Sequence, residues 1–466
     1  MTTRRKHARF RSRCWNALVL VGISWQGFLI IWMTNHQSNK KNQKAHFILQ
    51  QQQQQQSYLQ HPKKREISSP WNNRPSTESS SYWWNATYQL PPPERLVALQ
   101  KNNSSYSLFN GTVPSWLTFY VEWHHEQRIK LYYNETMDDC RFLVLTCRRD
   151  TVCGGVSDRL KSVPLLLQLA ALYDRIFYIH WERPAPLEYY LQPGAVLDWR
   201  VPEEFRRTMM MTTTTPHEPV YRTVNDLLTG LRDPHASIVQ VTLQDQHGGS
   251  SWYNRIENYR QQGYTRDEIR SLLLLSSSSS SSSSSPHSNL PRHFRHHFRS
   301  IWSTLFVPSP FLAQAIQERQ TVWGLTDKTP YVAAHVRALY RPVKTTNHEA
   351  WVMHVWHCAR ALRPQTPVVL LSDSVDVLQA ALVYTHSHPD TMMRVAPPAT
   401  VVHLDQTEPR PVQEYIDTFV DLYIMAQAQC ITHGRGGYGR LGVLLSQNAS
   451  CFFNYYQGGR TMSCDA

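Results

Sequence analysis

The chain has 466 residues and a formal net charge of +13, and 41% of its residues are hydrophobic. The positive charge is not by itself evidence for an anionic partner, because six of the basic residues stand together before residue 14. None of the eight cysteines forms a CxxC pair, which argues against a structural zinc site.

The first predicted element is a membrane anchor. A basic cytosolic tail, residues 1–13, precedes the apolar run CWNALVLVGISWQGFLIIWM at residues 14–33, which contains no charged side chain. Twenty helical residues at about 1.5 Å each span about 30 Å, close to the hydrocarbon thickness of a bilayer. The basic excess before the run predicts a type II signal anchor, with the tail in the cytosol and the rest of the chain in the lumen. The alternative is a buried helix of a soluble protein.

Residues 34–137 are predicted to form a stem with low-complexity and glycosylated segments. The part up to about residue 80 contains a glutamine run (Gln50–Gln56) and few aliphatic side chains, so it cannot bury enough apolar surface to offset the entropy of ordering. Five of the six N-x-S/T sequons lie between residues 85 and 136, as expected for a lumenal segment. An odd number of cysteines follows the anchor, so at least one has no partner in its own chain. These seven are Cys140, Cys147, Cys153, Cys358, Cys430, Cys451 and Cys464.

An N-terminal α/β domain is predicted over residues 138–300. Residues 141–146 and 175–179 have the pattern of buried strands, residues 160–173 that of a helix, and the first turn between them reads CGGVSDRL. Such a glycine-rich turn lets the backbone approach a ligand closely, and phosphates are commonly bound there in open α/β sheets. Many α/β proteins use the same turn for geometry alone.

The end of this domain has a weaker pattern. It contains two short helical segments, a serine-rich insertion (Ser276–Ser285) and the histidine-rich stretch RHFRHHFR at residues 292–299. This stretch could bind a metal or an anionic surface, but a solvated linker followed by a helix is the favoured interpretation.

A second α/β domain is predicted over residues 301–466. The predicted strands are residues 331–337, 367–373, 400–404, 430–433 and 451–455. The predicted helices between them are residues 347–362, 375–384, 413–429 and 439–446. This alternation predicts parallel sheets, with ligands at the carboxyl ends of strands in a cleft between the two domains.

Polar groups follow two of these strands. His335 and Arg337 point to the same side of the first strand, because one residue separates them. An arginine there can bind a diphosphate bidentately, or it forms a structural ion pair. Asp373 ends the next strand, where it could accept hydrogen bonds from a base or ribose, or cap the following helix.

A second glycine-rich turn reads GRGGYGR at residues 434–440. Four glycines in six residues and two arginines favour a phosphate-binding turn over a purely geometric one.

Together, these motifs resemble the fucosyltransferase superfamily, which includes α1,6-fucosyltransferases, xyloglucan fucosyltransferases and protein O-fucosyltransferases. The shared order is GGxxDRL, a strand ending in His-x-Arg, and Asp-x-x-x-Met-Ala-x-Ala before the last loop, over roughly residues 138–456. The resemblance implies an α/β, GT-B-like fold, with two Rossmann-type domains facing across a cleft, preceded by the transmembrane helix and disordered stem. It also implies inverting, metal-independent transfer of fucose from GDP-fucose to a glycan or glycoprotein acceptor. The anchor and stem look like those of type II Golgi membrane glycosyltransferases.

By this resemblance, His335 would hold the guanine and Arg337 the β-phosphate. Asp421 matches a family aspartate near the base, and Gly154 and Gly155 match the loop beside the diphosphate. No cofactor and no nucleic-acid partner are expected.

Three positions depart from the family pattern. Ala338 follows the arginine where many members have a second arginine, and Gly436 and Gly437 replace two phosphate-binding serines. Backbone N–H groups or Arg435 would then serve the phosphate. These departures keep open a catalytically inactive glycan-binding or scaffold pseudoenzyme of the same fold.

Two carboxylates are candidates for the general base that takes the proton of the acceptor hydroxyl. Glu349 and Asp158 each stand near the start of a helix, where a carboxylate also favours the helix dipole without any catalytic role. No Asp-x-Asp motif occurs, so the divalent-metal site of the other main architecture of lumenal glycosyltransferases is not expected. A lumenal sulfotransferase is a further alternative, although Cys147-Arg148-Arg149 fits a phosphosulfate loop badly.

Overall fold

The structure is a computed structural model, and all the residues that it describes belong to one compact unit, Leu90–Ala466. The described residues are 113–132, 140–148, 153–194, 196–202, 205–206, 220–243, 248–278, 293–325, 329–338, 347–396, 412–448, 450–457 and 460–464. The predicted cytosolic tail and anchor, and the predicted stem up to residue 112, lie outside these ranges. Within them, no helix combines the length and the hydropathy that crossing a membrane requires.

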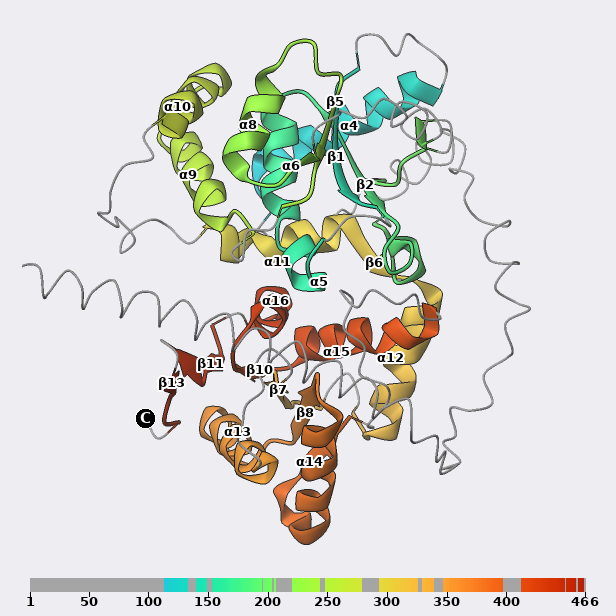
Figure 1. Cartoon of the computed structure of the whole chain (residues 1–466), viewed down its shortest axis with the longest axis vertical. Helices are drawn as coiled ribbons and strands as arrows, with labels where there is room; N and C mark the ends of the chain where they lie inside the picture. Colours follow the sequence, from blue (N-terminus) through green and yellow to red (C-terminus); the bar gives the residue numbers. More distant parts are fainter. Residues whose placement is uncertain are drawn as a thin grey trace, which may run out of the picture. The chain divides into compact units, whose positions relative to one another are not determined.

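The first sheet is parallel and has four strands in the order β2-β1-β5-β4. The strands are β1 (Phe142–Cys147), β2 (Ile176–Trp181), β4 (Val220–Tyr221) and β5 (Ile238–Val241). Every residue of β1 and β2 is buried, as in parallel sheets covered on both faces. The helices of this part are α5 (Val156–Leu160), α6 (Val163–Leu172), α8 (Val224–Arg232), α9 (Ser250–Gln261) and α10 (Arg266–Ser278) (Figure 1).

Helix α4 (Ser115–Tyr132) packs against this sheet, although the sequence predicted a stem up to residue 137. The hydroxyl of Tyr120 donates to the carbonyl of Arg175 and accepts from the backbone N–H of Phe177, both at 3.0 Å. Leu117 and His124 are also buried, each 1% exposed. The stem prediction was therefore wrong over this helix. Polar and sequon-rich segments on both sides concealed its apolar face.

The second sheet is parallel and has five strands in the order β11-β10-β7-β8-β9. The strands are β7 (Val332–Val336), β8 (Val368–Ser372), β9 (Met393–Val395), β10 (Cys430–His433) and β11 (Phe452–Asn454). Its helices are α13 (His348–Leu362), α14 (Val375–Ser387), α15 (Ile416–Gln427) and α16 (Gly437–Leu445). Two parallel sheets confirm the α/β class. The strand predicted at residues 400–404 lies outside the described residues.

Two further helices lie between the sheets in the sequence, α11 (His293–Leu305) and α12 (Pro310–Val322), together with the short antiparallel pair of β3 (Leu191–Pro193) and β6 (Phe306–Pro308). The histidine-rich stretch forms α11 itself and is not a solvated linker. His293 and His297 are both 9% exposed, and the hydroxyl of Tyr253 lies 3.0 Å from Nδ1 of His297. These histidines therefore help to pack α11 against α9.

Six of the seven cysteines after the predicted anchor form disulfides. The pairs are Cys147–Cys153, Cys358–Cys464 and Cys430–Cys451. The seventh, Cys140, is buried at the start of the first sheet.

Candidate functional site

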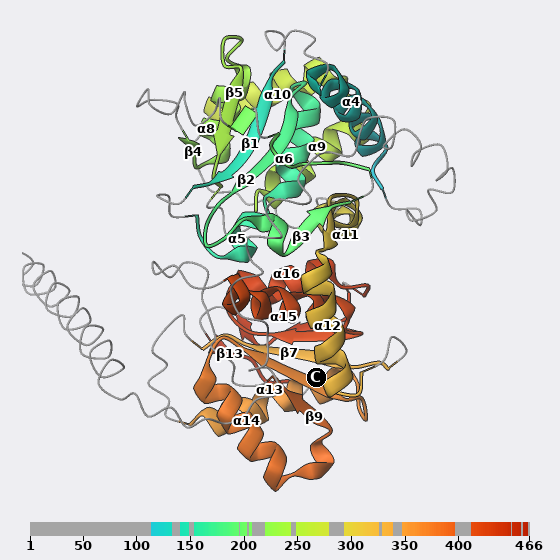
Figure 2. The same ribbon diagram turned by 90° about the vertical axis from the view of Figure 1, so that its right-hand side faces the viewer.

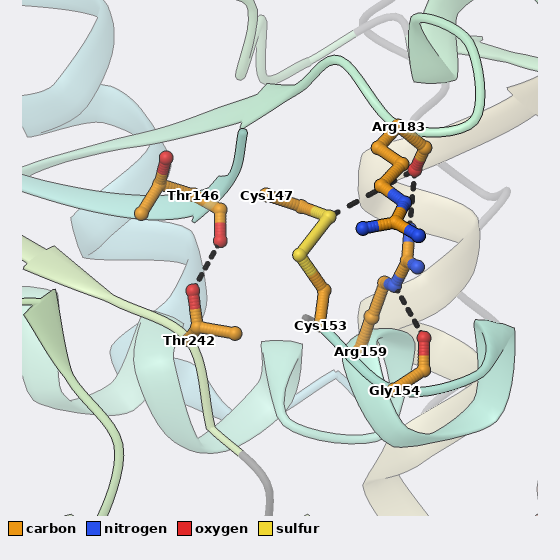
Figure 3. Close-up of a disulfide and its surroundings, with 7 residues drawn as sticks. All are labelled: Thr146, Cys147, Cys153, Gly154, Arg159, Arg183 and Thr242. Atoms are coloured by element: carbon orange, nitrogen blue, oxygen red, sulfur yellow. Dashed lines mark hydrogen bonds between the residues drawn. A yellow bond between two sulfur atoms is a disulfide. The ribbon is translucent and has the colours of Figure 1, made fainter. Parts of the chain in front are cut away.

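The first glycine turn connects β1 to α5 and is fixed by covalent and ionic contacts. The Cys147–Cys153 disulfide joins the last residue of β1 to the residue before Gly154, whose φ is +75° (Figure 3). Nε of Arg159 donates to the carbonyl of Gly154 at 2.7 Å, and the same guanidinium donates to the carbonyl of Arg183. Its Cζ lies 4.4 Å from the ring centroid of Trp181. The turn is thus held from both of its ends.

Asp158, one of the two predicted general bases, stabilises this turn. Its Oδ2 accepts a hydrogen bond from the backbone N–H of Gly155 at 3.3 Å. Its Oδ1 lies 3.7 Å from Nζ of Lys161. These contacts give Asp158 a structural role at the start of α5, close to the helix-dipole alternative that the sequence left open, and a catalytic role of Asp158 stays a prediction.

The second glycine turn connects β10 to α16, and two of its glycines are required for packing. A methyl group on Gly434 would lie 2.6 Å from the ring of Tyr455, and one on Gly439 would lie 2.6 Å from Cβ of His433. For these two positions the geometric interpretation of the motif is correct.

The two middle glycines face polar side chains. Gly436 has a φ of +98°, and a methyl group on it would lie 2.7 Å from Cδ of Arg337. A methyl group on Gly437 would lie 2.6 Å from Oγ of Ser157 and 2.9 Å from Nζ of Lys161. Arg337 comes from the end of β7, whereas Ser157 and Lys161 come from α5 and the residue after it. The start of α16 therefore lies next to side chains from both sheet regions, and Figure 2 shows α5 beside α16.

His335, at the end of β7, is 3% exposed and lies close to α16. Its ring centroid is 5.1 Å from that of Tyr438. Burial lowers its pKa to about 3, and the neighbouring Arg337 and His433 act in the same direction. Its Nδ1 has no hydrogen-bond partner among the described residues. A neutral, buried imidazole of this kind can exchange a hydrogen bond with a ligand.

Asp373 contacts the strand end that carries the predicted arginine. Its Oδ1 accepts from the backbone N–H of Ala338 at 2.6 Å, and its Oδ2 lies 3.8 Å from Nε of Arg337. The structural ion pair anticipated for Arg337 is therefore present. The cap of α14 is Ser374 and not Asp373, because the hydroxyl of Ser374 accepts from the backbone of Val377.

Asp421, on α15, forms an ion pair with Arg319 of α12. Its Oδ1 lies 3.4 Å from Nη1 of Arg319, and Nη2 of the same arginine donates to Oδ1 of Asp417 at 2.7 Å. Burial raises the pKa of Asp421 to about 7, although Arg319 opposes the shift. The neighbouring Tyr438 has its pKa raised by burial and by the two carboxylates. Tyr438 thus lies close enough to Asp421 to interact with it electrostatically, and its ring contacts that of His335.

Two further residues that the sequence predicted for the site are Glu349 and Arg435. Glu349 is exposed in the first turn of α13, and no contact within the described part of the chain joins it to the glycine turns. Arg435 has its Cζ 5.8 Å from the ring centroid of Tyr456. The structure therefore brings together His335, Arg337, Gly436 and Gly437, whereas Glu349 stands apart from them.

Sequence reasoning missed Ser157 and Lys161, which are 3% and 1% exposed. One signal was available. Lys161 interrupts a strongly apolar segment, and a lysine among buried residues is rare unless it is paired.

The side chains around α16 suit an anion better than a metal ion. Arg337 and Lys161 are cations, and the backbone N–H groups of the first helical turn add a positive partial charge. Within the described ranges, one group of residues has the spacing of metal ligands: His354, Cys358 and Cys464. The two cysteines of this group form a disulfide.

No protein-family model matches the chain, and no curated protein matches its sequence. The chain is similar in structure to a mutant of FUT1 from Arabidopsis thaliana in complex with GDP, with a TM-score of 0.46 and 11% identity, over 74% of this chain and 80% of that one. It is also similar to the fucosyltransferase NodZ from Bradyrhizobium, with a TM-score of 0.38 and 13% identity, over 66% and 94% of the two chains. These proteins are fucosyltransferases, the group that the sequence resembles.

Proposed function

We propose that the protein is an inverting, metal-independent fucosyltransferase that moves fucose from GDP-fucose to a glycan or glycoprotein acceptor. The observation that carries the proposal is the start of α16, where Arg337 lies against Gly436 and the buried ring of His335 lies against Tyr438. This arrangement offers a cation, backbone N–H groups and a neutral hydrogen-bonding ring within one short segment, as a nucleoside diphosphate requires.

The proposed chemistry places the diphosphate at the amino end of α16. As the bond between the fucose C1 and the β-phosphate oxygen breaks, that oxygen keeps the electron pair and becomes more negative. Arg337 and the first turn of α16 would stabilise this charge without a divalent cation. The acceptor hydroxyl attacks C1 from the opposite face, and its proton passes to a carboxylate, for which Asp158 and Glu349 stay the candidates.

The proposal includes the cellular setting. The two sheets would form the two Rossmann-type domains of a GT-B-like enzyme that face each other across a cleft. The apolar run at residues 14–33 would anchor the protein in the Golgi membrane as a single-pass type II protein. The three disulfides support a lumenal location of the folded part.

One observation favours a second candidate, a pseudoenzyme that binds the donor without transferring sugar. Of the two candidate bases, Asp158 caps its own turn and Glu349 is exposed on α13. Asp158 lies beside the start of α16, 3.3 Å from the position of a methyl group on Gly437, but its carboxylate is already engaged by Gly155 and Lys161. GDP-fucose binding with no transfer to any tested glycan acceptor would support this candidate.

A thermal-shift experiment tests the donor assignment. The purified protein is heated with GDP, UDP, CMP or adenosine 3′,5′-bisphosphate in the presence of EDTA, because a ligand of the native state raises the melting temperature. We expect stabilisation by GDP only. Stabilisation by adenosine 3′,5′-bisphosphate would instead favour the sulfotransferase alternative, and no shift with saturating GDP would contradict the proposal.

Arg337→Ala is the diagnostic variant. Loss of its charged hydrogen bonds should weaken GDP binding by about 10- to 100-fold. Arg270→Ala is the matched control. Arg270 lies on α10 and forms an exposed ion pair with Asp174 at 2.8 Å. Equal losses of GDP binding in both variants would show that the effect is not specific to the site.

A further inference from the structure

We propose that Asn448 is an N-glycosylation site and carries an oligosaccharide on its side-chain nitrogen Nδ2. The inference rests on the lumenal location that is part of the proposed function. Asn448-Ala449-Ser450 fits the N-x-S/T pattern, and of the six sequons in the chain it is the one whose asparagine lies within the described residues. A sequon alone is a frequent chance match, so the inference depends on how the structure presents this asparagine.

The sequon lies in a surface turn between α16 and β11. The backbone N–H of Cys451 donates to the carbonyl of Asn448 at 3.0 Å, which closes the turn. Gln447 and Ser450 are exposed, and Asn448 is partly exposed. An attached glycan is bulky and hydrophilic and must extend into solvent, which a turn at the surface allows.

The hydrogen bonds of Asn448 leave its amide nitrogen accessible. The hydroxyl of Ser450 donates to Oδ1 of Asn448 at 2.7 Å, and the backbone N–H of Asn448 donates to the hydroxyl of Ser446 at 3.2 Å. Within the described part of the chain, Nδ2 of Asn448 takes part in no hydrogen bond. The serine of the sequon therefore holds the amide oxygen, while the nitrogen that would receive the sugar keeps both of its donor positions.

The modification is a group transfer in which the asparagine amide is the acceptor. The sugar donor is an oligosaccharide carried on a lipid diphosphate. Nδ2 of Asn448 forms a bond to C1 of the first sugar and loses one proton. The bond between C1 and the diphosphate oxygen breaks, and the electron pair stays on the lipid diphosphate.

The position of Asn448 keeps a glycan away from the proposed nucleotide site. That site lies at the start of α16, whereas Asn448 follows the end of this helix. Nine residues at about 1.5 Å each separate the two helix ends by about 13 Å. The disulfide Cys430–Cys451 also fixes the turn to the first residue of β10, at the amino end of the strand. A glycan on Asn448 therefore leaves the carboxyl ends of the strands open to a nucleotide.

Site-specific mass spectrometry tests the inference. The full chain is produced in animal cells and treated with peptide N-glycosidase in heavy-oxygen water, which converts a glycosylated asparagine to an aspartate that carries heavy oxygen. We expect this label at Asn448. Asn448→Gln and Ser450→Ala should each remove one glycan, seen as a shift in gel mobility, whereas Ser450→Thr should keep it. The control is Asn258→Gln on α9, because Asn258 is also partly exposed but stands in no sequon.

The other sequons separate failure of the inference from failure of the proposed location. If the sequons between residues 85 and 136 carry glycans but Asn448 is unmodified, the inference is overturned and the lumenal location stands. A mobility of Ser450→Ala equal to that of the wild-type protein would overturn it in the same way. If none of the six sequons carries a glycan, the inference fails together with the lumenal location itself.

Discussion

The two glycine turns have similar sequences but different surroundings. The first turn precedes α5, a helix of five residues, and is closed by the Cys147–Cys153 disulfide and by Arg159. The second precedes α16, a helix of nine residues, and its middle glycines face Arg337 and Lys161. The first turn is thus held rigidly, and the second provides the helix end at which we propose that an anion binds. A glycine-rich turn between a strand and a helix does not by itself identify a binding site, because the neighbouring charges decide its role.

The largest expected effect comes from replacing one glycine in each turn. Gly436→Ala and Gly154→Ala both place a side chain at a positive φ, which should lower the free energy of unfolding by about 1–2 kcal/mol. Only Gly436→Ala also displaces Arg337, so it should weaken GDP binding at least about tenfold. Urea unfolding and GDP titration measure the two effects. An equal loss of binding in both variants would contradict the division of roles between the turns.

Removal of the Cys147–Cys153 disulfide should have a smaller effect on binding. The closed loop is short, with a sequence separation of 6, so the double alanine variant should lose about 2 kcal/mol of unfolding free energy. GDP binding should fall by a few-fold, because the support for Ser157 and Lys161 becomes less rigid.

The Cys430–Cys451 disulfide provides the control for this experiment. Its sequence separation is 21, so its removal should cost more stability, about 3 kcal/mol. It should affect GDP binding less, because Cys430 begins β10 and the glycine turn follows the other end of that strand. A greater loss of binding in this control would contradict the supporting role of the first turn.

The free energy of unfolding should depend on pH more strongly than GDP binding does. Burial lowers the pKa of His124 and His335 to about 3 and that of His297 to about 4, so below about pH 6.5 the unfolded chain binds three protons on these histidines that the native protein does not. Asp421, with its pKa raised to about 7, keeps one proton in the native state and opposes this effect. For these four groups the net difference is two protons, three on the histidines minus one on Asp421, so the unfolding free energy should fall by about 2.7 kcal/mol per pH unit between pH 6 and about pH 5.

The variant Asp421→Asn sharpens this prediction. Without the opposing carboxyl, the unfolding free energy should fall on acidification by about 1.4 kcal/mol per pH unit more than in the wild-type protein, which corresponds to one further proton. Urea unfolding at several pH values measures both slopes. A slope that is unchanged in Asp421→Asn would show that this carboxyl titrates normally in the native protein.

The sequence predicted the regular part of the fold because the buried strands have continuous apolar patterns. The segments around Leu143, Ala333 and Leu370 are strands as predicted, since parallel strands are covered on both faces and carry few polar residues. Helix α4 was missed because polar and sequon-rich segments stand on both sides of it in the sequence. This helix is held by contacts with residues far away in the sequence: Tyr120 binds Arg175, 55 positions further along the chain.

The sequence predicted the site only where the residues stand in one local motif. His335 and Arg337 share a strand, and Gly436 and Gly437 share a turn, so their spacing gave a direct indication. Ser157 and Lys161 meet Gly437 only through the packing of α5 against α16, which no local pattern contains. The role of Asp158 also depends on its hydrogen bond to Gly155, which the sequence left as one of two alternatives.

The most direct test of the account is amide hydrogen exchange with and without saturating GDP in the presence of EDTA. Exchange reports local opening, and a bound ligand protects the amides that it contacts. We expect the strongest new protection at the start of α16, at residues 436–440, and weaker protection at the first turn. Protection confined to other segments, or no change with GDP, would contradict a nucleotide site at this helix end.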